Sequence, residues 1–137
     1  KLHEAKRLGK KGKLGFYKHT GDKPLVDPSV YSLIGAQQKK SIGSDEMIER
    51  MTYTMINEAA MCLAEGIINQ PSDVEIGMIF GTGFAPFRGG LLRYADSEGI
   101  DKIVAQLEKY AHTYGARFTP CDYLIQIKKN GKKFYNE

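Results

Sequence analysis

Cysteine is scarce in this chain of 137 residues, since Cys62 and Cys121 are the only two. Neither belongs to a Cys-x-x-Cys motif, which argues against a zinc ribbon and against a thioredoxin-like redox site. One cysteine falls within a helical pattern and the other at an expected helix start. We therefore expect two buried or half-buried free thiols in a reducing compartment, not a disulfide.

Histidine is scarce as well, and long apolar runs are lacking. His3, His19 and His112 lie far apart and show no i, i+4 spacing, so the sequence indicates no metal site. His112 falls off the apolar face of its helix, and we expect it to be exposed. No run approaches the ~18 apolar residues that a membrane helix requires, so we expect no membrane span.

The chain starts with Lys1 and not with methionine, and no apolar signal region follows it. We therefore expect the sequence to be a piece of a longer protein. Its length allows one domain with a core but not two full ones. The apolar share of 42% and the charged share of 26% are those of an ordinary globular protein.

Positive charge is concentrated at the N-terminus. Residues 1–40 hold ten of the 20 Lys and Arg residues but only three of the 16 Asp and Glu residues, a net charge of +7 against −3 for the rest. Gly and Pro are frequent there, with only a short helical pattern at about residues 28–35. We expect residues 1–9 to be the last turns of a helix, followed by an extended basic connector and a domain boundary near residue 40.

Apolar periodicity predicts a long helix at the start of residues 41–137. Ser44, followed by two acids, is the expected N-cap, and the pattern reaches about Ile68. Within this helix Asn57 and Glu58 form a polar pair that is either surface decoration or a buried hydrogen-bonding position. The expected apolar stripe consists of Ile48, Met51, Met55, Ala59, Cys62 and Leu63.

Four more helices are expected. A capping box of Ser72 and Glu75 predicts a second helix that runs to about Phe80 and stops at Gly81. No later stretch alternates with period two for long enough to predict a strand. We therefore expect residues 41–137 to be an all-α bundle of about five helices. The remaining three helices are expected near residues 89–96, over residues 100–114, and up to about Asn130. The last of them would have Thr119 as its N-cap and Pro120 as its first helical residue.

Residues 81–94 (GTGFAPFRGGLLRY) form the most unusual stretch of the chain. Such a glycine-rich loop is either a phosphate cradle or a rigid corner between helices. A dinucleotide loop follows a strand, and a Walker loop continues with Lys and Ser or Thr after its last glycine. This loop follows a helix and has neither completion, which favours the corner.

The corner interpretation gives each side chain a task. We expect Phe84 and Phe87 to fill the core, and Gly89–Gly90 to allow a close approach of two helices. We expect Arg88 and Arg93 to hydrogen-bond the carbonyl ends of nearby helices. No nucleophile–base constellation can be assembled from the sequence.

Basic residues from Lys6 to Lys18, with Phe16 and Tyr17 among them, are also compatible with nucleic-acid binding. Because these residues lie on a connector and not on one face of a folded unit, a solvated linker is the favoured interpretation. A free-standing helical binding module with a basic nucleic-acid-binding leader remains the alternative function.

Four segments of the chain form a specific combination in this order: residues 9–17 (GKKGKLGFY), 55–68 (MINEAAMCLAEGII), 81–96 (GTGFAPFRGGLLRYAD) and 114–124 (YGARFTPCDYL). Together they resemble the C-terminal end of the 3-hydroxyacyl-CoA dehydrogenases, and most closely the multifunctional α-subunit of the fatty-acid β-oxidation complex.

The resemblance implies a domain with the fold of the 6-phosphogluconate-dehydrogenase C-terminal domain. Residues 1–40 would be the tail of a first helical repeat plus the basic connector, and residues 41–137 the second repeat. The family's connector ends in Gly-x-Gly-Phe-Tyr. Residues 13–17 match this pattern except that Lys13 replaces its first glycine.

The resemblance also implies a parent enzyme that oxidises 3-hydroxyacyl-CoA with NAD in fatty-acid β-oxidation and that also carries an enoyl-CoA hydratase domain. The family's catalytic His–Glu pair and NAD-binding glycines lie upstream, so we expect this fragment to be inactive and to bind no cofactor itself. Expected partners are the preceding repeat and the Rossmann domain, acyl-CoA, the thiolase β-subunit and a second copy of the fragment, but not nucleic acid. The expected location is the bacterial cytoplasm, or a mitochondrion or peroxisome.

Three residues are candidates for substrate binding, two of them, Phe80 and Asn57, by resemblance. Phe80 stands where related enzymes have a substrate-binding tyrosine, so it keeps the ring without the hydroxyl. Asn57 matches an asparagine shared by both repeats, for which a structural role in the second repeat is the alternative. Arg88, within the loop, is the third.

Overall fold

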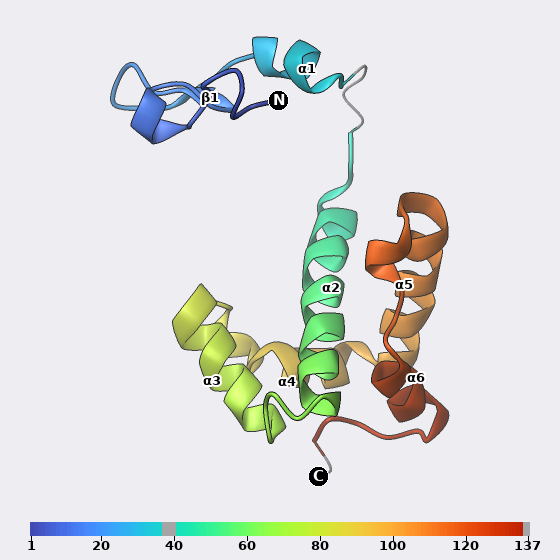
Figure 1. The fold of residues 1–137 in the computed structure, drawn as a ribbon. Helices are drawn as coiled ribbons and strands as arrows, with labels where there is room; N and C mark the ends of the chain where they lie inside the picture. Colours follow the sequence, from blue (N-terminus) through green and yellow to red (C-terminus); the bar gives the residue numbers. More distant parts are fainter. Residues whose placement is uncertain (37–40, 136–137) are drawn as a thin grey trace. The chain divides into compact units, whose positions relative to one another are not determined.

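The computed structural model describes residues 1–36 and 41–135, which fall into two compact units, Lys1–Ser41 and Ile42–Glu137. We call them the N-terminal unit and the helical unit (Figure 1). The boundary expected near residue 40 falls on residues 37–40, which lie outside the described residues. The assignment of the two units to successive repeats stays a prediction.

The N-terminal unit is folded, so the prediction of an extended connector is wrong. Strand β1 (Tyr17–Lys18) pairs antiparallel with β2 (Leu25–Val26). The predicted helix at about residues 28–35 is confirmed as α1 (Ser29–Ile34). The predicted last helical turns at residues 1–9 are instead hydrogen-bonded turns, because Lys6 takes a positive φ of 53° that a helix does not allow. A short 3-10 turn, η1 (Lys10–Gly12), follows them.

A buried ion pair organises this unit. Arg7 Nη2 lies 2.7 Å from Asp27 Oδ2, and the two side chains are 9% and 4% exposed. Arg7 also donates to the carbonyl oxygen of Gly15 at 2.6 Å, and the Ser29 hydroxyl donates to Asp27 Oδ1 at 2.9 Å. The Arg7 guanidinium lowers the pKa of Asp27 to about 2. Charge pairing thus connects turns that bury little apolar surface.

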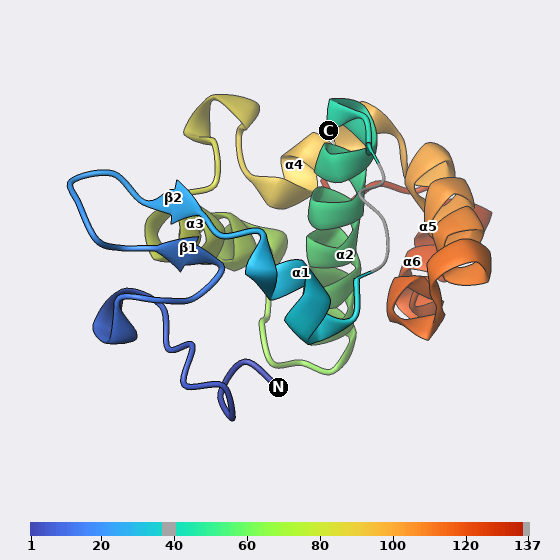
Figure 2. The same cartoon turned by 90° about the horizontal axis from the view of Figure 1, so that it is seen from above.

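The helical unit is all-α, as predicted. Within the described residues of this unit, five α-helices surround one core, with 3-10 turns η2 (Pro86–Arg88) and η3 (Ala116–Phe118) between them. Figures 1 and 2 show α3 on one side of α2, and α5 and α6 on the other. The helices are α2 (Ser44–Ala64), α3 (Pro71–Thr82), α4 (Leu91–Glu98), α5 (Ile100–Tyr114) and α6 (Asp122–Lys129).

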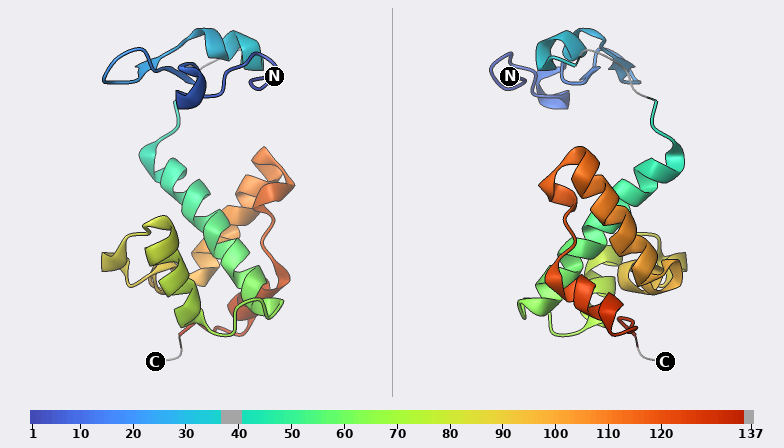
Figure 3. Two further views of the ribbon diagram at one scale, coloured as in Figure 1. Left: turned by 60° about the vertical axis from the view of Figure 1, so that its left-hand side comes forward. Right: turned by 90° about the vertical axis from the view of Figure 1, so that its right-hand side faces the viewer.

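Helix α2 is central, since it contacts α4, α5 and α6, while α3 contacts α4. Figure 3 shows α2 crossing α5 obliquely. Side chains buried completely at these contacts exclude water from the centre and supply most of the stabilisation. They include Tyr53, Ile56, Leu91, Leu92, Ile103, Leu107 and Leu124.

The predicted apolar stripe of α2 is only partly correct. Ala59 is buried and Leu63 packs partly against the core, but Ile48 is 51% exposed and Met51 64% exposed. The buried face is centred on Tyr53, Ile56 and Ala60. Because α2 carries apolar residues on two faces, its periodicity does not identify which face meets the core. The helix also ends at Ala64, before the expected Ile68.

All three predicted N-caps are wrong by one or two residues. The N-cap positions are Gly43 for α2, Gln70 for α3 and Cys121 for α6, where Ser44, Ser72 and Thr119 were expected. Local signals place a helix end only to within about two residues. Of the polar side chains assigned to these caps, that of Glu75 has partners elsewhere in the fold, as described below. The end of the last helix near Asn130 is confirmed.

Other expectations concern thiols, histidine and membranes. Cys62 and Cys121 are free and half-buried, and burial raises the pKa of the Cys121 thiol. His112 is exposed, as predicted. Across residues 1–36 and 41–135, no group of three or more His, Cys, Asp or Glu side chains is placed to hold a metal. Within the same ranges, no helix combines the length and the apolar character needed to cross a membrane.

Candidate functional site

The glycine loop is a corner between α3 and α4. Helix α3 continues past the expected stop at Gly81 and ends at Gly83, whose φ of 74° closes the helix. Phe84 is half-buried, and the centre of its ring lies 6.4 Å from the centre of the Tyr94 ring. Phe87 is 84% exposed, so its predicted place in the core is wrong. Proline at the start of η2 turns the chain and leaves the Phe87 ring outside.

A buried carboxylate joins the two helices at this corner. Glu75, on α3 and 6% exposed, accepts the backbone N–H of Leu92 at 3.1 and 3.2 Å and that of Arg93 at 2.9 Å. A Cβ at Gly90 would overlap this carboxylate, which confirms the close approach expected at Gly89–Gly90. The predicted capping box is wrong, because Glu75 caps α4 and not its own helix. In the sequence, the signal for this role was the position of an acidic residue between the apolar residues of α3.

This contact also tests the phosphate-cradle interpretation. Free N–H groups at a helix N-terminus are what a phosphate loop offers its ligand. The N–H groups of Leu92 and Arg93 already face the Glu75 carboxylate. The start of α4 is therefore an occupied anion site, and this loop does not fit the pyrophosphate of a dinucleotide such as NAD.

The C-terminal segment is tied to the same corner. The Tyr135 hydroxyl donates to Glu75 Oε1 at 3.2 Å, and burial beside this carboxylate raises the pKa of Tyr135 to about 12. Asp96 on α4 accepts the backbone N–H groups of Phe134 and Tyr135, each at 2.9 Å. Residues from α3, α4 and the chain beyond α6 thus form one hydrogen-bonded group.

The three predicted site residues lie in different surroundings. Asn57 is 7% exposed, its Nδ2 donates to the Thr119 carbonyl at 2.9 Å, and its Oδ1 accepts the Cys121 N–H at 2.7 Å. It is therefore a buried hydrogen-bonding residue, and both ends of its amide are used by backbone. Phe80 is 86% exposed on α3. Of the three, Arg88 alone is among the described residues that line a pocket beside this corner.

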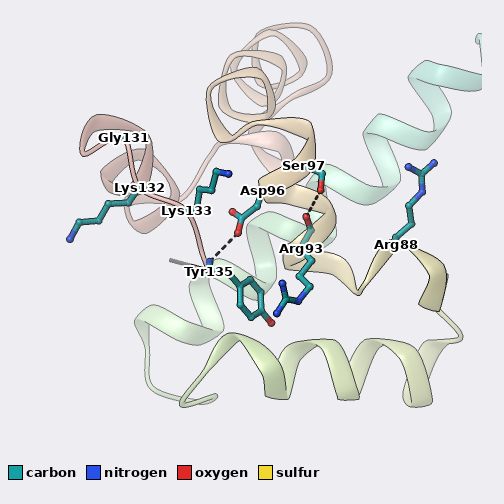
Figure 4. A pocket seen from close by; sticks show the side chains of 8 residues that line it. All are labelled: Arg88, Arg93, Asp96, Ser97, Gly131, Lys132, Lys133 and Tyr135. Atoms are coloured by element: carbon teal, nitrogen blue, oxygen red, sulfur yellow. Dashed lines mark hydrogen bonds between the residues drawn. The ribbon is translucent and has the colours of Figure 1, made fainter. Parts of the chain in front are cut away.

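That pocket, which we call the basic pocket, has a volume of about 550 Å³ (Figure 4). The Arg93 guanidinium lies 4.0 Å from the centre of the Tyr135 ring, and that of Arg88 lies 5.4 Å from the Tyr94 ring. Among the described residues Arg88 makes no hydrogen bond to a helix carbonyl, so that expectation is wrong for Arg88. The pocket is lined by Arg88, Arg93, Asp96, Ser97, Gly131, Lys132, Lys133 and Tyr135.

A second, apolar groove lies between α2 and α3. Its volume is about 280 Å³, and its walls include Met55, Cys62 and Met78. The same two helices expose Met51 and Phe80 to solvent. Apolar side chains gathered on one pair of helices are typical of a surface that another protein element covers.

Comparison with known proteins identifies relatives of this chain, although no family model matches it. It is 49% identical over 138 residues to the fatty acid oxidation complex subunit alpha of Idiomarina loihiensis. The match covers 98% of this chain and 19% of that protein, so the chain spans about a fifth of its relative. It is also similar to the crystal structure of the dehydrogenase part of multifunctional enzyme 1 from C. elegans. There the TM-score is 0.64 and the identity 29%, over 91% of this chain and 31% of the other.

Proposed function

Because this chain is related along nearly its whole length to part of a fatty acid oxidation complex subunit alpha, we propose that it is the C-terminal helical scaffold of an NAD-dependent 3-hydroxyacyl-CoA dehydrogenase. The similarity to the dehydrogenase part of multifunctional enzyme 1 supports the choice of the dehydrogenase as the activity that this scaffold serves. In the parent, NAD and the reacting groups belong to a preceding domain. The parent works in the cytoplasm of a bacterium, or in a mitochondrion or peroxisome.

The use of buried polar groups supports a scaffold role. Glu75 and Asn57 each hold backbone N–H or carbonyl groups of a distant segment. No buried side-chain nitrogen or oxygen among the described residues lacks a hydrogen-bond partner. A residue that serves catalysis or ligand binding commonly keeps such a group available. The interior is therefore arranged for rigidity.

The exposed apolar side chains give the scaffold a surface to pack with. We assign the groove between α2 and α3, with Met51, Ile76 and Phe80, to contact with the preceding helical repeat of the parent. Burial of each large side chain contributes about 1.5–3 kcal/mol. Phe80 has no hydroxyl and offers the substrate cleft an apolar contact only.

The nucleic-acid alternative has weaker support. Of the basic residues that suggested it, Arg7 is buried in the pair with Asp27, and Lys18 Nζ lies 3.6 Å from the same carboxylate. These two cations serve the fold of the N-terminal unit, which leaves fewer charges for a phosphate backbone.

The test combines the isolated chain with a truncated relative. The fatty acid oxidation subunit alpha of Idiomarina loihiensis, shortened by the segment that matches this chain, is assayed for 3-hydroxyacyl-CoA-dependent NAD reduction. We expect this chain alone to show no turnover, and to raise the activity of the truncated subunit when added in trans. Turnover by this chain alone, or no effect in trans, contradicts the proposal.

A further inference from the structure

The basic pocket has an excess of positive charge that the scaffold role does not explain. Of the eight described residues that line it, four are cations, Arg88, Arg93, Lys132 and Lys133, and one is an acid, Asp96. A smaller hollow of about 210 Å³ shares Lys132 and Lys133 and adds Lys128 and Asp101. The lysines of the two hollows lie at the end of α6 and in the chain that follows it.

The acid that the described residues contribute to the basic pocket has other partners. Both oxygens of Asp96 accept backbone N–H groups, from Phe134 and Tyr135. Among residues 1–36 and 41–135, neither Lys132 nor Lys133 forms an ion pair with a carboxylate. The positive charge of the two lysines is therefore not balanced within the site, and like charges held close together favour a bound anion.

The backbone that carries these cations is held in place. Asp96 fixes the segment just after Lys132 and Lys133, and Tyr135 is anchored on Glu75. Arg93 lies against the Tyr135 ring, and Arg88 against the rings of Tyr94 and Phe87. Cations on a rigid frame lose less conformational freedom when a ligand binds.

We propose that the basic pocket binds the phosphate groups of a small molecule with at least two such groups. Figure 4 shows Arg88 and Lys132 at opposite ends of the site, with Arg93 and Lys133 between them, so the charge suits an extended anion. Arginine forks match phosphate oxygens and lysine binds them as a point charge. The volume of about 550 Å³ lies in the range of small-molecule sites.

The test titrates the full chain with inorganic pyrophosphate and with ADP by isothermal calorimetry. The double variant Lys132→Ala/Lys133→Ala removes two pocket cations, and Lys10→Ala/Lys11→Ala removes the same charge from the N-terminal unit. We expect about tenfold weaker binding or more in the first and about twofold or less in the second, because a hydrogen bond to a charged group is lost only in the pocket. Circular dichroism checks that both variants are folded.

The two probes distinguish the source of the phosphates. Equal affinities mean that phosphate groups alone are recognised, whereas tighter binding of ADP means that the site also contacts the nucleoside, and either result supports the proposal. Absence of binding to both probes, or equal losses in the two double variants, overturns it. The scaffold function stands or falls with the trans assay and not with these titrations.

Discussion

The Glu75 carboxylate on α3 accepts the backbone N–H of Leu92 on α4, 17 residues later in the chain. One buried side chain thus does for the next helix what an N-cap usually does within its own helix. The same carboxylate also accepts the hydroxyl of Tyr135, so it connects three segments.

Replacement of Glu75 by alanine should destabilise the helical unit by about 2–4 kcal/mol. The change leaves the N–H groups of Leu92 and Arg93 without their partner in a buried place. Urea unfolding followed by circular dichroism measures the loss. Glu108→Ala, at an exposed position of α5, should change stability by less than about 0.5 kcal/mol. A similar loss in both variants contradicts the capping role.

Gly90→Ala should cost about 2 kcal/mol or more. Gly90 has a φ of 114°, and the added Cβ would overlap the Glu75 carboxylate. Gly77→Ala is the matched control, because Gly77 lies within α3 and its Cβ would meet open space. Alanine there should stabilise by about 0.5–1 kcal/mol through helix propensity. If thermal unfolding shows the same sign for both changes, the steric account fails.

Asn57→Ala should destabilise the helical unit by about 1–3 kcal/mol, since it leaves the Thr119 carbonyl and the Cys121 N–H without partners. Asn69→Ala, at an exposed position after α2, is the control and should be nearly neutral. A stable Asn57→Ala chain that fails to raise activity in the trans assay would instead indicate a direct role at the substrate cleft.

The N-terminal unit should lose stability in acid as Asp27 is protonated. The folded-state pKa of Asp27, about 2, lies below its ordinary value of 3.8. The stabilisation is therefore complete above about pH 4 and disappears as the pH falls towards 2. Amide NMR signals of Ser29 and Val30, followed from pH 5 to pH 2, report the transition. Asp27→Asn should remove the pH dependence, and a transition that persists in this variant would assign it to another group.

Removal of exposed apolar side chains from α3 should reduce self-association of the isolated chain. Ile76 is 58% exposed and Phe80 86% exposed. The double variant Ile76→Ser/Phe80→Ser should sediment as a monomer at concentrations at which the unmodified chain associates. The control Leu25→Ser/Val26→Ser changes two exposed apolar residues of the N-terminal unit. If only this control loses self-association, the associating surface belongs to the N-terminal unit and not to α3.

Several features of the fold followed from local sequence. The period of apolar residues placed α5 at residues 100–114, and the structure has Ile100–Tyr114. The glycines at positions 89 and 90 predicted a close approach, which the Glu75 carboxylate makes at Gly90. Such features depend on the properties of neighbouring residues, so a single sequence is sufficient to predict them.

Other features depended on partners far along the chain. The sequence by itself determined an all-α unit, the approximate positions of its helices and a glycine corner, because helix period and backbone freedom are local properties. Only the tertiary structure decided which face of α2 is buried. Met51 and Ile56 both count as apolar positions of the helical pattern, but Met51 is exposed and Ile56 is buried. It also decided that Glu75 caps α4 and that Arg88, Arg93, Lys132 and Lys133 line one pocket. Contacts between distant segments therefore decide which helix face is buried and which side chains meet, where local sequence allows several arrangements.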